Sequence, residues 1–478
     1  MSNRQKNDDG TYTMTVDSPL SAGDRLTFRG LASHICTINY AGAVTFADVT
    51  VWGGSGFAFS GWMGEDRVTL TRCTVTPGPK PAGATEDRML STCDATHYSN
   101  MRVGPVIEDC VFTDMTDDGT NINGHYMMTS SYDADTNRFT IDPEFDVVTG
   151  TYTSHTEGVA VGDRIRILTL DFAWIGDTTA ASDADNGMIT LADRFEGMTD
   201  HVVLQNLDRQ SNGFAIRNCV VERIRSRGLL IKGTDGIIEH CTIRDVRMAG
   251  ILVKPESNEW PEFGFAQNLV IRNNHIIGTG YAAPTNNLYA AINVSGDTAQ
   301  SGDPIYQLHR GILIEGNFIE NRRNESAIKV SHALDVTVKN NTITARDKSV
   351  HGNPEKDVQI PITVISATNV EISGNTVPAS ARGYAELKTG ANNIWGSDLN
   401  TENAPVTVTD PQPIREESAE TEVITDLTES EALEVIGGAD GPTAITTTGS
   451  LSWLWIAAAV LVFAIGITAG VLVIKKKR

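Results

Sequence analysis

Leu70-Thr71-Arg72-Cys73-Thr74-Val75 is a clear early copy of a six-residue pattern that recurs along the chain. The pattern reads apolar-x-x-(Cys or Asn)-x-apolar, and we call its fourth residue the ladder position. Ladder positions fall at residues 49, 73, 110, 219, 241, 274, 317, 341 and 375, with Val49 placed there by alignment. The shortest steps run from 49 to 73, from 219 to 241 and from 317 to 341, and the longer steps imply loops of variable length.

This repeat predicts an all-β fold, a right-handed parallel β-helix. Its segments alternate Val and Ile with polar residues and are bounded by Gly, Asn and Asp, a pattern typical of strands. A fixed period with insertions indicates a solenoid, in which each repeat packs on its neighbours. Residues one coil apart in sequence should therefore lie side by side.

Four of the six cysteines, Cys73, Cys110, Cys219 and Cys241, occupy ladder positions. An inward-facing stack of small buried thiols is the favoured interpretation. Disulfides remain an alternative if the protein is secreted. The chain lacks CxxC and Cys/His spacing, which argues against a metal centre built on cysteine.

Composition narrows the possible functions. The chain has 478 residues and a formal net charge of −22, which argues against binding nucleic acid because phosphates would be repelled. Forty-three glycines and few aromatic residues suit a turn-rich β protein. The acidic balance fits an extracellular surface acting on a neutral sugar, and it fits simple solubility equally well.

A stretch between the coils at Cys110 and Cys219 lacks the repeat but keeps strand-like runs joined by polar turns. Its Gly162-Asp163-Arg164-Ile165 echoes Gly23-Asp24-Arg25-Leu26 near the N-terminus. The predicted divisions are residues 1–30 (remnant of a β-barrel module, or strands leading into the helix), 31–125 (first coils), 126–212 (inserted β-barrel) and 213–385 (later coils).

The C-terminal part is predicted to anchor the chain in a membrane. Residues 386–450 are expected to form a disordered stalk, because eleven acidic residues face one basic residue between Asp398 and Glu434. Residues 451–474 form an uncharged apolar run that is long enough to span a bilayer. The basic tail 475–478 should be cytoplasmic, which predicts a single-pass protein of the cell membrane with its β-helix extracellular.

The N-terminus does not match this prediction of export. Met1 to Thr11 is hydrophilic and has no apolar core of a signal peptide. We therefore expect the coding sequence to extend upstream of Met1.

Three carboxylates recur at the spacing of one coil. Asp117 and Asp118 follow Asp94 at an interval that matches the shortest steps of the ladder, so all three should gather on one wall of the helix. Such a cluster suits hydrolysis of a glycosidic bond, in which one acid protonates the leaving oxygen and another carboxylate activates water. Aspartates in turns often only cap backbone amides, but three at this spacing favour catalysis.

Spacing alone leaves the stereochemistry open. Neighbouring strands lie about 4.8 Å apart, whereas retaining enzymes separate their carboxyls by about 5–5.5 Å and inverting enzymes by about 6.5–9.5 Å. A bend at Gly119 would let Asp117 and Asp118 share one site and would widen the gap to Asp94. Crowding should raise the pKa of one acid. We expect Asp117 to be that acid, with Asp94 and Asp118 as the base pair.

The segments that contain these aspartates resemble those of a known enzyme family. Ser91-Thr92-Cys93-Asp94-Ala95-Thr96-His97-Tyr98, followed by Asp117-Asp118-Gly119-Thr120-Asn121-Ile122-Asn123-Gly124, resembles glycoside hydrolase family 110. That family comprises inverting, exo-acting α-1,3-galactosidases built on a parallel β-helix with small β-barrel modules. The resemblance covers roughly residues 20–380. It implies a glycan partner with terminal α-galactose, no cofactor and no metal.

The chain departs from the family pattern, as we know it, at three positions. Gly119 stands for alanine and Tyr98 for phenylalanine, which are mild changes. Asn123 stands for histidine, which changes a hydrogen-bonding group beside the site and puts the exact sugar preference in question.

Six further residues are candidates for binding the substrate. His97 could orient a carboxylate or bind a sugar hydroxyl, and an aromatic ring in a non-repeating loop could carry the apolar face of a sugar. The predicted substrate-binding residues are His97, Asn121, Arg227, Glu256, Trp260 and Glu262. Each could instead have a purely structural role.

Two other functions remain open. One is another β-helix enzyme acting on carbohydrate, such as a polygalacturonase-like hydrolase or a polysaccharide lyase. A polygalacturonase would need Gly-His-Gly and Arg-Ile-Lys segments, of which Leu230-Ile231-Lys232 is only a partial echo. The other is an adhesin that binds glycans without cleaving them.

Overall fold

The computed structural model describes most of the repeat region and the insert. The described residues are 4–9, 12–14, 33–146, 151–153, 158–256, 262–281, 290–296, 309–321, 326–345, 360–399 and 407–408, without 183, 185, 380, 382 and 389. Within these ranges, no helix has the length and apolar character needed to cross a bilayer. The predicted span 451–474 and most of the predicted stalk lie outside them.

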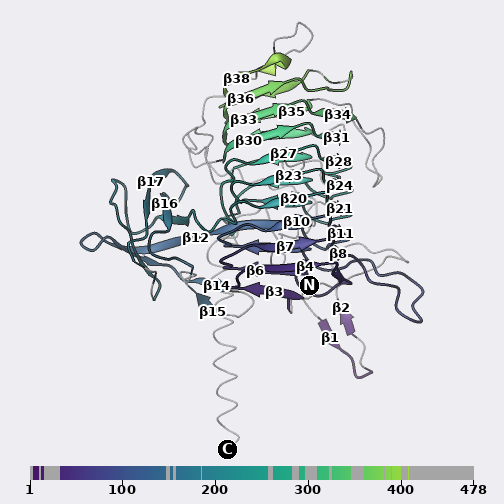
Figure 1. Cartoon of the computed structure of the whole chain (residues 1–478), viewed down its shortest axis with the longest axis horizontal. Coiled ribbons are helices and arrows are strands. Elements are labelled where there is room, and N and C mark those ends of the chain that lie inside the picture. The colour runs from purple at the N-terminus through teal and green to yellow at the C-terminus, as the bar shows by residue number, and fades with distance from the viewer. Residues whose placement is uncertain are drawn as a thin grey trace, which may run out of the picture. The chain divides into compact units, whose positions relative to one another are not determined.

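The repeats stack into a parallel β-helix with three sheets, and a complete coil gives one strand to each sheet (Figure 1). The site-bearing sheet contains, in order, β3 (Cys36–Asn39), β6 (Phe59–Trp62), β9 (Thr96–Ser99), β12 (Thr120–Asp133), β22 (Leu229–Ile231), β25 (Ile251–Val253), β29 (Ile292–Val294), β32 (Ile328–Ser331), β35 (Ile362–Ile365), β37 (Ala385–Leu387) and β39 (Thr407–Val408).

The other two sheets are also parallel throughout. The ten-stranded sheet contains β4 (Val44–Ala47), β7 (Val68–Thr71), β10 (Val106–Glu108), β20 (Ala215–Arg217), β23 (Ile237–Glu239), β27 (Val270–Arg272), β30 (His309–Glu315), β33 (Ala333–Lys339), β36 (Thr368–Ser373) and β38 (Asn392–Trp395). The eight-stranded sheet contains β5 (Thr50–Val51), β8 (Thr74–Val75), β11 (Val111–Thr113), β21 (Val220–Glu222), β24 (Thr242–Arg244), β28 (His275–Ile277), β31 (Phe318–Asn321) and β34 (Thr342–Ala345).

The ladder positions lie at the corner between the ten-stranded and eight-stranded sheets, as the repeat predicted. The residue just before each has a left-handed backbone; φ is 52° at Arg72 and 54° at Asn273, and Gly316 has 65°. A single left-handed residue turns the chain sharply, and Asn, Asp and Gly tolerate that conformation best. The ladder residue then points into the core, and Cys73, Asn274 and Asn317 are fully buried.

The ladder changes its chemistry halfway along. In the later coils asparagines bond to one another, from Asn274 Nδ2 to Asn317 Oδ1 at 3.0 Å and from Asn317 Nδ2 to Asn341 Oδ1 at 2.9 Å. In the earlier coils the buried thiols donate weakly to carbonyls, as Cys219 Sγ does to Ile107 O at 3.5 Å. The favoured prediction of a packed stack of thiols is therefore confirmed.

The insert is an antiparallel structure with its own core. Its ring of strands is the outer part of β12, β13 (Arg138–Ile141), β18 (Met188–Thr190), β17 (Trp174–Thr179), β16 (Arg164–Leu168) and β19 (Val203–Asn206), closed by the bridge Ala180↔Leu191. Phe139, Ile165 and Leu204 pack inside it. Strand β12 is continuous from the helix into the insert (Figure 1), so no linker separates them.

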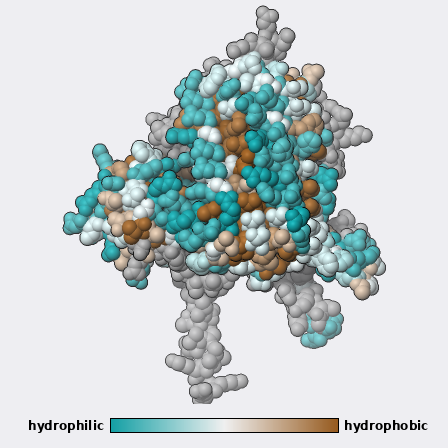
Figure 2. All heavy atoms as spheres, in the orientation of Figure 1, coloured by the Kyte–Doolittle hydropathy of each residue, from teal (hydrophilic) through white to brown (hydrophobic). Residues whose placement is uncertain are grey.

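Two short pairs of strands complete the described structure. Strands β14 (Glu144–Asp146) and β15 (Thr151–Thr153) are antiparallel, as are β1 (Arg4–Lys6) and β2 (Tyr12–Met14). The surface of the helix seen in Figure 2 is mainly hydrophilic, with an apolar stripe running across the stacked strands.

The helix extends past residue 385, where the sequence analysis ended it. Strands β37 and β38 continue the parallel pairing and are followed by a 3-10 turn, η2 (Ser397–Leu399). Asp398 ends the ladder by accepting from Asn375 Nδ2 at 2.8 Å. This last coil was not recognised in the sequence because Asp398 replaces the ladder asparagine. Its carboxylate was assigned to the predicted acidic stalk.

Candidate active site

The candidate site lies on the outer face of the sheet that holds β9, β12 and β22. This part of the sheet is buried on both faces, since every residue of β9 and of β22 is buried. Asp94, Asp118 and Arg227 precede these three strands and stack on successive coils, as Ala95 N bonds Asp118 O and Gly119 N bonds Arg227 O. The spacing of one coil thus brings the aspartates together as predicted.

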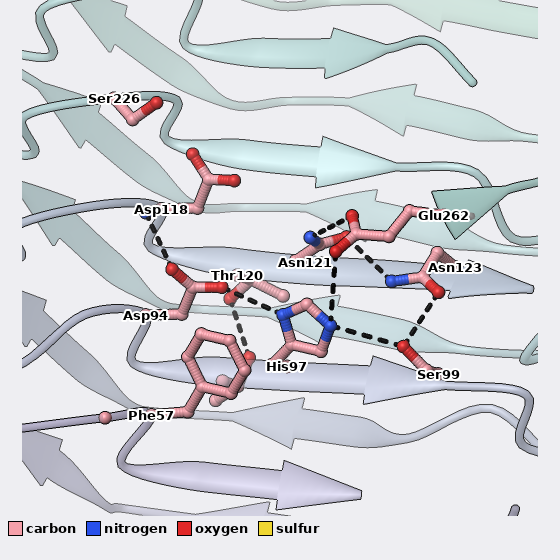
Figure 3. A network of polar contacts seen from close by, with 12 residues as sticks. Phe57, Asp94, His97, Ser99, Asp118, Thr120, Asn121, Asn123, Ser226 and Glu262 are labelled. Carbon is pink, nitrogen blue, oxygen red and sulfur yellow. Dashed lines mark hydrogen bonds and ion pairs between the residues drawn. The ribbon is translucent and has the colours of Figure 1, made fainter. Parts of the chain in front are cut away.

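Each aspartate of this column accepts a backbone amide of the next coil, and Figure 3 shows the bond between Asp94 and Asp118. Asp118 N donates to Asp94 Oδ1 at 3.0 Å, and Arg227 N donates to Asp118 Oδ1 at 2.8 Å. The second oxygens face basic side chains, because Asp94 Oδ2 lies 3.0 Å from His97 Nδ1 and Asp118 Oδ2 lies 2.9 Å from Arg227 Nη2. One oxygen of each carboxylate therefore holds the fold and the other faces the site.

Asp117 joins the same cluster. It is 1% exposed, and one carboxylate oxygen from each of Asp94, Asp117 and Asp118 lies within 4.8 Å of the others. Oxygens this close form a donor set that a cation could bridge. They also form a set in which like charges repel, so that one acid is favoured in its protonated form.

Burial favours the protonated form of Asp118. Burial raises the pKa of Asp118 to about 7, with Asp94 adding to the rise and the Arg227 guanidinium opposing it. The spacing of the aspartates led us to expect Asp117 as the acid, because the raised pKa of Asp118 could not be read from the sequence. A carboxyl that keeps its proton near neutrality can act as an acid, which makes Asp118 a candidate for that role.

His97 sits between two carboxylates. Its Nδ1 faces Asp94 Oδ2, and its Nε2 lies 3.6 Å from Glu262 Oε1 and 3.2 Å from Ser99 Oγ. Phe57 stacks on the imidazole with ring centroids 4.3 Å apart and planes 6° from parallel. This packing fixes the ring, so that His97 orients Asp94 as one of its predicted roles required.

Glu262 reaches the site from a later coil. It begins β26 (Glu262–Phe263), which pairs antiparallel with β12 at Gly124 and His125. Phe263 anchors this short strand by packing against Tyr126 and Phe265. Glu262 Oε2 thereby accepts from Asn121 Nδ2 at 2.7 Å.

Lys232 is a site residue that the sequence analysis set aside. It directly follows β22 and is fully buried, with Nζ 2.7 Å from Glu262 Oε2 and 3.2 Å from Glu256 Oε2. Strand register could have identified Lys232, because Lys232 aligns with Asn123 on the preceding coil and with Ser99 on the coil before that. The long insert between these coils hides that relation in the sequence.

The remaining predicted residues join the same network, with one exception. Glu256 Oε1 lies 3.5 Å from Arg227 Nη2, and its side chain is 26% exposed against 3% for Arg227. Although burial works against it, Arg227 and Lys232 hold the pKa of Glu256 below its ordinary value. Trp260 lies outside the described residues.

Comparison with known proteins gives the class first. Residues 206–404 match the family model described as the right-handed beta helix region. Together with the three parallel sheets, this makes the chain an all-β, right-handed β-helix protein with an antiparallel insert. Among solved structures, the Dettilon tailspike protein aligns over 78% of this chain and 61% of its own, with 12% identity and a TM-score of 0.38.

Two relatives of known activity are also similar to this chain. The chain is 24% identical over 279 residues to alpha-1,3-galactosidase A of Akkermansia muciniphila, covering 56% of this chain and 43% of the relative. The same protein of Shewanella woodyi is 24% identical over 288 residues, covering 60% and 45%. The chain is thus distantly similar to these galactosidases and spans less than half of their length.

Proposed function

We propose that this protein is a glycoside hydrolase that removes terminal α-1,3-linked galactose from glycans. The observation that carries the proposal is the cluster of Asp94, Asp117 and Asp118, in which Asp118 has a pKa raised to about 7 beside the carboxylate of Asp94. A carboxyl that keeps its proton near neutrality, beside other carboxyls, is an arrangement that glycosidases use. The distant similarity to two alpha-1,3-galactosidases supports the choice of sugar.

The roles follow from the ionisation states. Asp118, protonated near neutrality, would donate its proton to the glycosidic oxygen as the bond to the sugar breaks. Asp94, held by His97, would then take a proton from the attacking water, with Asp117 sharing that role. This order forms one C–O bond with water while the other breaks, and it inverts the anomeric carbon. One oxygen of each of these carboxylates lies within 4.8 Å of the others, closer than the roughly 6.5–9.5 Å usual for inverting enzymes, so the choice of inversion rests on the resemblance to an inverting family and not on this spacing.

The surrounding groups suit a neutral sugar. Asn121 and His97 offer donors for hydroxyl groups, and Glu262 and Glu256 offer acceptors. The basic Lys232 and Arg227 already pair with carboxylates, so a uronate would compete with the protein's own acids. This favours a galactosidase over a polygalacturonase-like enzyme.

The direct test is turnover by the full protein. Purified protein incubated with a glycan ending in α-1,3-galactose should release free galactose, detected by chromatography. α-1,4- and α-1,6-linked galactosides serve as linkage controls. Absence of release from all three by folded protein would refute the proposal.

A second candidate function is binding of glycans without cleavage. The observation in its favour is that Asp94 Oδ1 and Asp118 Oδ1 both accept backbone amides, as purely structural aspartates do. Galactoside binding by calorimetry, combined with no turnover and unaltered affinity in the Asp118→Asn variant, would favour this candidate.

We further propose that the protein is tethered at the cell surface. The support is the apolar run 451–474 followed by the basic residues 475–478, which orient a span with its preceding part outside the cell. This arrangement would present the β-helix to extracellular glycans.

A further inference from the structure

Lys232 places a positive charge where solvent does not reach. Its side chain is 0% exposed, and its ammonium group lies between the carboxylates of Glu262 and Glu256. A buried ion pair is often no more stabilising than apolar residues of similar volume, because both charges lose their hydration. Both glutamates also contact a second basic side chain, Glu262 through His97 and Glu256 through Arg227.

Each glutamate connects Lys232 to one aspartate of the proposed mechanism. Through Glu262 the path runs to His97 at 3.6 Å and on to Asp94 at 3.0 Å. Through Glu256 it runs to Arg227 at 3.5 Å and on to Asp118 at 2.9 Å.

The two paths meet again at the aspartates. The amide of Asp118 donates to Asp94 at 3.0 Å, which closes a ring of seven residues around the site. Figure 3 shows the half of this ring that contains His97 and Glu262.

We propose that Lys232 is a positioning residue that fixes the orientation of Asp94 and Asp118 through the two glutamates. The expected effect of Lys232 on kcat rests on the proposed glycosidase function. Its effect on the positions of the aspartates does not depend on that function. Without the ammonium group, Glu256 and Glu262 would face each other as like charges and seek other donors. Arg227 and His97 would be drawn toward the glutamates and away from the aspartates.

Other ionisable groups lie beside the ring and can affect the ionisation of its members. Lys254 acts on Glu256, and His34 stacks on Phe57 on the face opposite His97. Asp117 lies beside Asp94 and Asp118. These groups are present in every variant of Lys232, so a difference between variants reports on Lys232.

The first test is Lys232→Met, which removes the charge and keeps the length of the side chain. We expect kcat to fall about 10²-fold, as for a small misplacement of catalytic groups, with a smaller change in KM. The alkaline limb of the pH profile should move to higher pH, because Arg227 would oppose the raised pKa of Asp118 less. Lys339→Met is the matched control, since Lys339 pairs with Glu315 on the ten-stranded sheet. Wild-type kcat and pH profile in Lys232→Met would overturn the proposal.

A second comparison is needed in case Lys232→Met, which leaves two buried glutamates without their cation, does not fold. Lys232→Met combined with Glu262→Gln removes one charge of each sign and is compared with Glu262→Gln alone. If Lys232 only neutralised Glu262, the two would have equal kcat, which would count against the proposal. We expect the double variant to be roughly tenfold slower, because Glu256 also loses its lysine.

A measurement without substrate separates this proposal from the proposed function. The ring nitrogen signals of His97 in NMR spectra should shift in Lys232→Met and stay unchanged in Lys339→Met. Unchanged His97 signals in Lys232→Met would refute the positioning role. Absence of galactoside turnover by the wild type would refute only the glycosidase function.

Discussion

Asp118 donates its backbone amide to the side chain of Asp94 at 3.0 Å, although the two residues belong to successive coils. The bond exists because one coil of the β-helix returns the chain to the same wall. It also means that the two carboxyls cannot move independently, so their charges interact at a fixed short distance. The chemistry expected of the site depends on this contact between Asp94 and Asp118. The stability of the fold depends on the buried residues at the ladder positions.

Replacing any one of Asp94, Asp117 and Asp118 by Asn should lower turnover by roughly 10³-fold or more. The fold should survive, because an Asn oxygen can still accept the amides that Asp94 Oδ1 and Asp118 Oδ1 accept. Initial rates on an α-1,3-galactoside, together with thermal unfolding, measure both effects. A variant that unfolds, or one that keeps wild-type rates, would contradict the assignment.

The activity should fall as pH rises through about 7. Asp118 must be protonated to act as the acid, and its pKa is raised to about 7 in the folded protein. The fraction carrying the proton, and with it kcat/KM, therefore decreases above that pH. A pH profile measured at constant ionic strength decides this, and a flat profile between pH 6 and about 9 would show that Asp118 is not the acid.

The first sugar released should be β-galactose, because direct attack by water inverts the α-linkage. Proton NMR spectra recorded before mutarotation distinguish the two anomers. Release of α-galactose would indicate a covalent intermediate and would end the inverting proposal.

Asn317→Ala should lower the free energy of unfolding by about 1–3 kcal/mol, the cost of leaving buried polar groups unpaired. The change leaves the Asn274 amide without its acceptor and opens the bond to Asn341 Oδ1 inside a dry core. Cys219→Ala at the equivalent position is the matched control and should cost less, because its thiol makes only weak contacts such as 3.5 Å to Ile107 O. Denaturant unfolding of both variants measures the difference, and equal losses would contradict the role given to the asparagine bonds.

Protease added to intact cells should release a large fragment that contains the β-helix. Cleavage is expected within residues 409–450, since acidic, proline-containing chain of this kind resists folding. Immunoblotting of the supernatant detects the fragment. Its appearance only after lysis would show that the proposed orientation is wrong.

Much of the fold could be predicted from local pattern. Ladder positions such as Cys73, Asn274 and Asn317 were recognisable because a β-helix repeats its inward-facing residues at each coil and its corner needs a residue that tolerates a left-handed backbone. The uninterrupted coil between Asp94 and Asp118 also fixed their proximity. Periodicity carries such information because it reflects short-range stacking.

Relations that cross an insertion required the tertiary structure. Lys232 stacks on Asn123, but the whole antiparallel insert separates them in the chain, so the sequence offered no period to connect the two. Glu262 is brought to Asn121 by an antiparallel strand that does not follow the repeat.

By itself, then, the sequence determined the parallel β-helix, the ladder and the gathering of Asp94, Asp117 and Asp118. Only the tertiary structure showed that the pKa of Asp118 is raised, because its burial and the opposing contact with Arg227 depend on elements far apart in the chain. A repeat fixes which residues stack, but ionisation depends on every charge and every layer of atoms around a group.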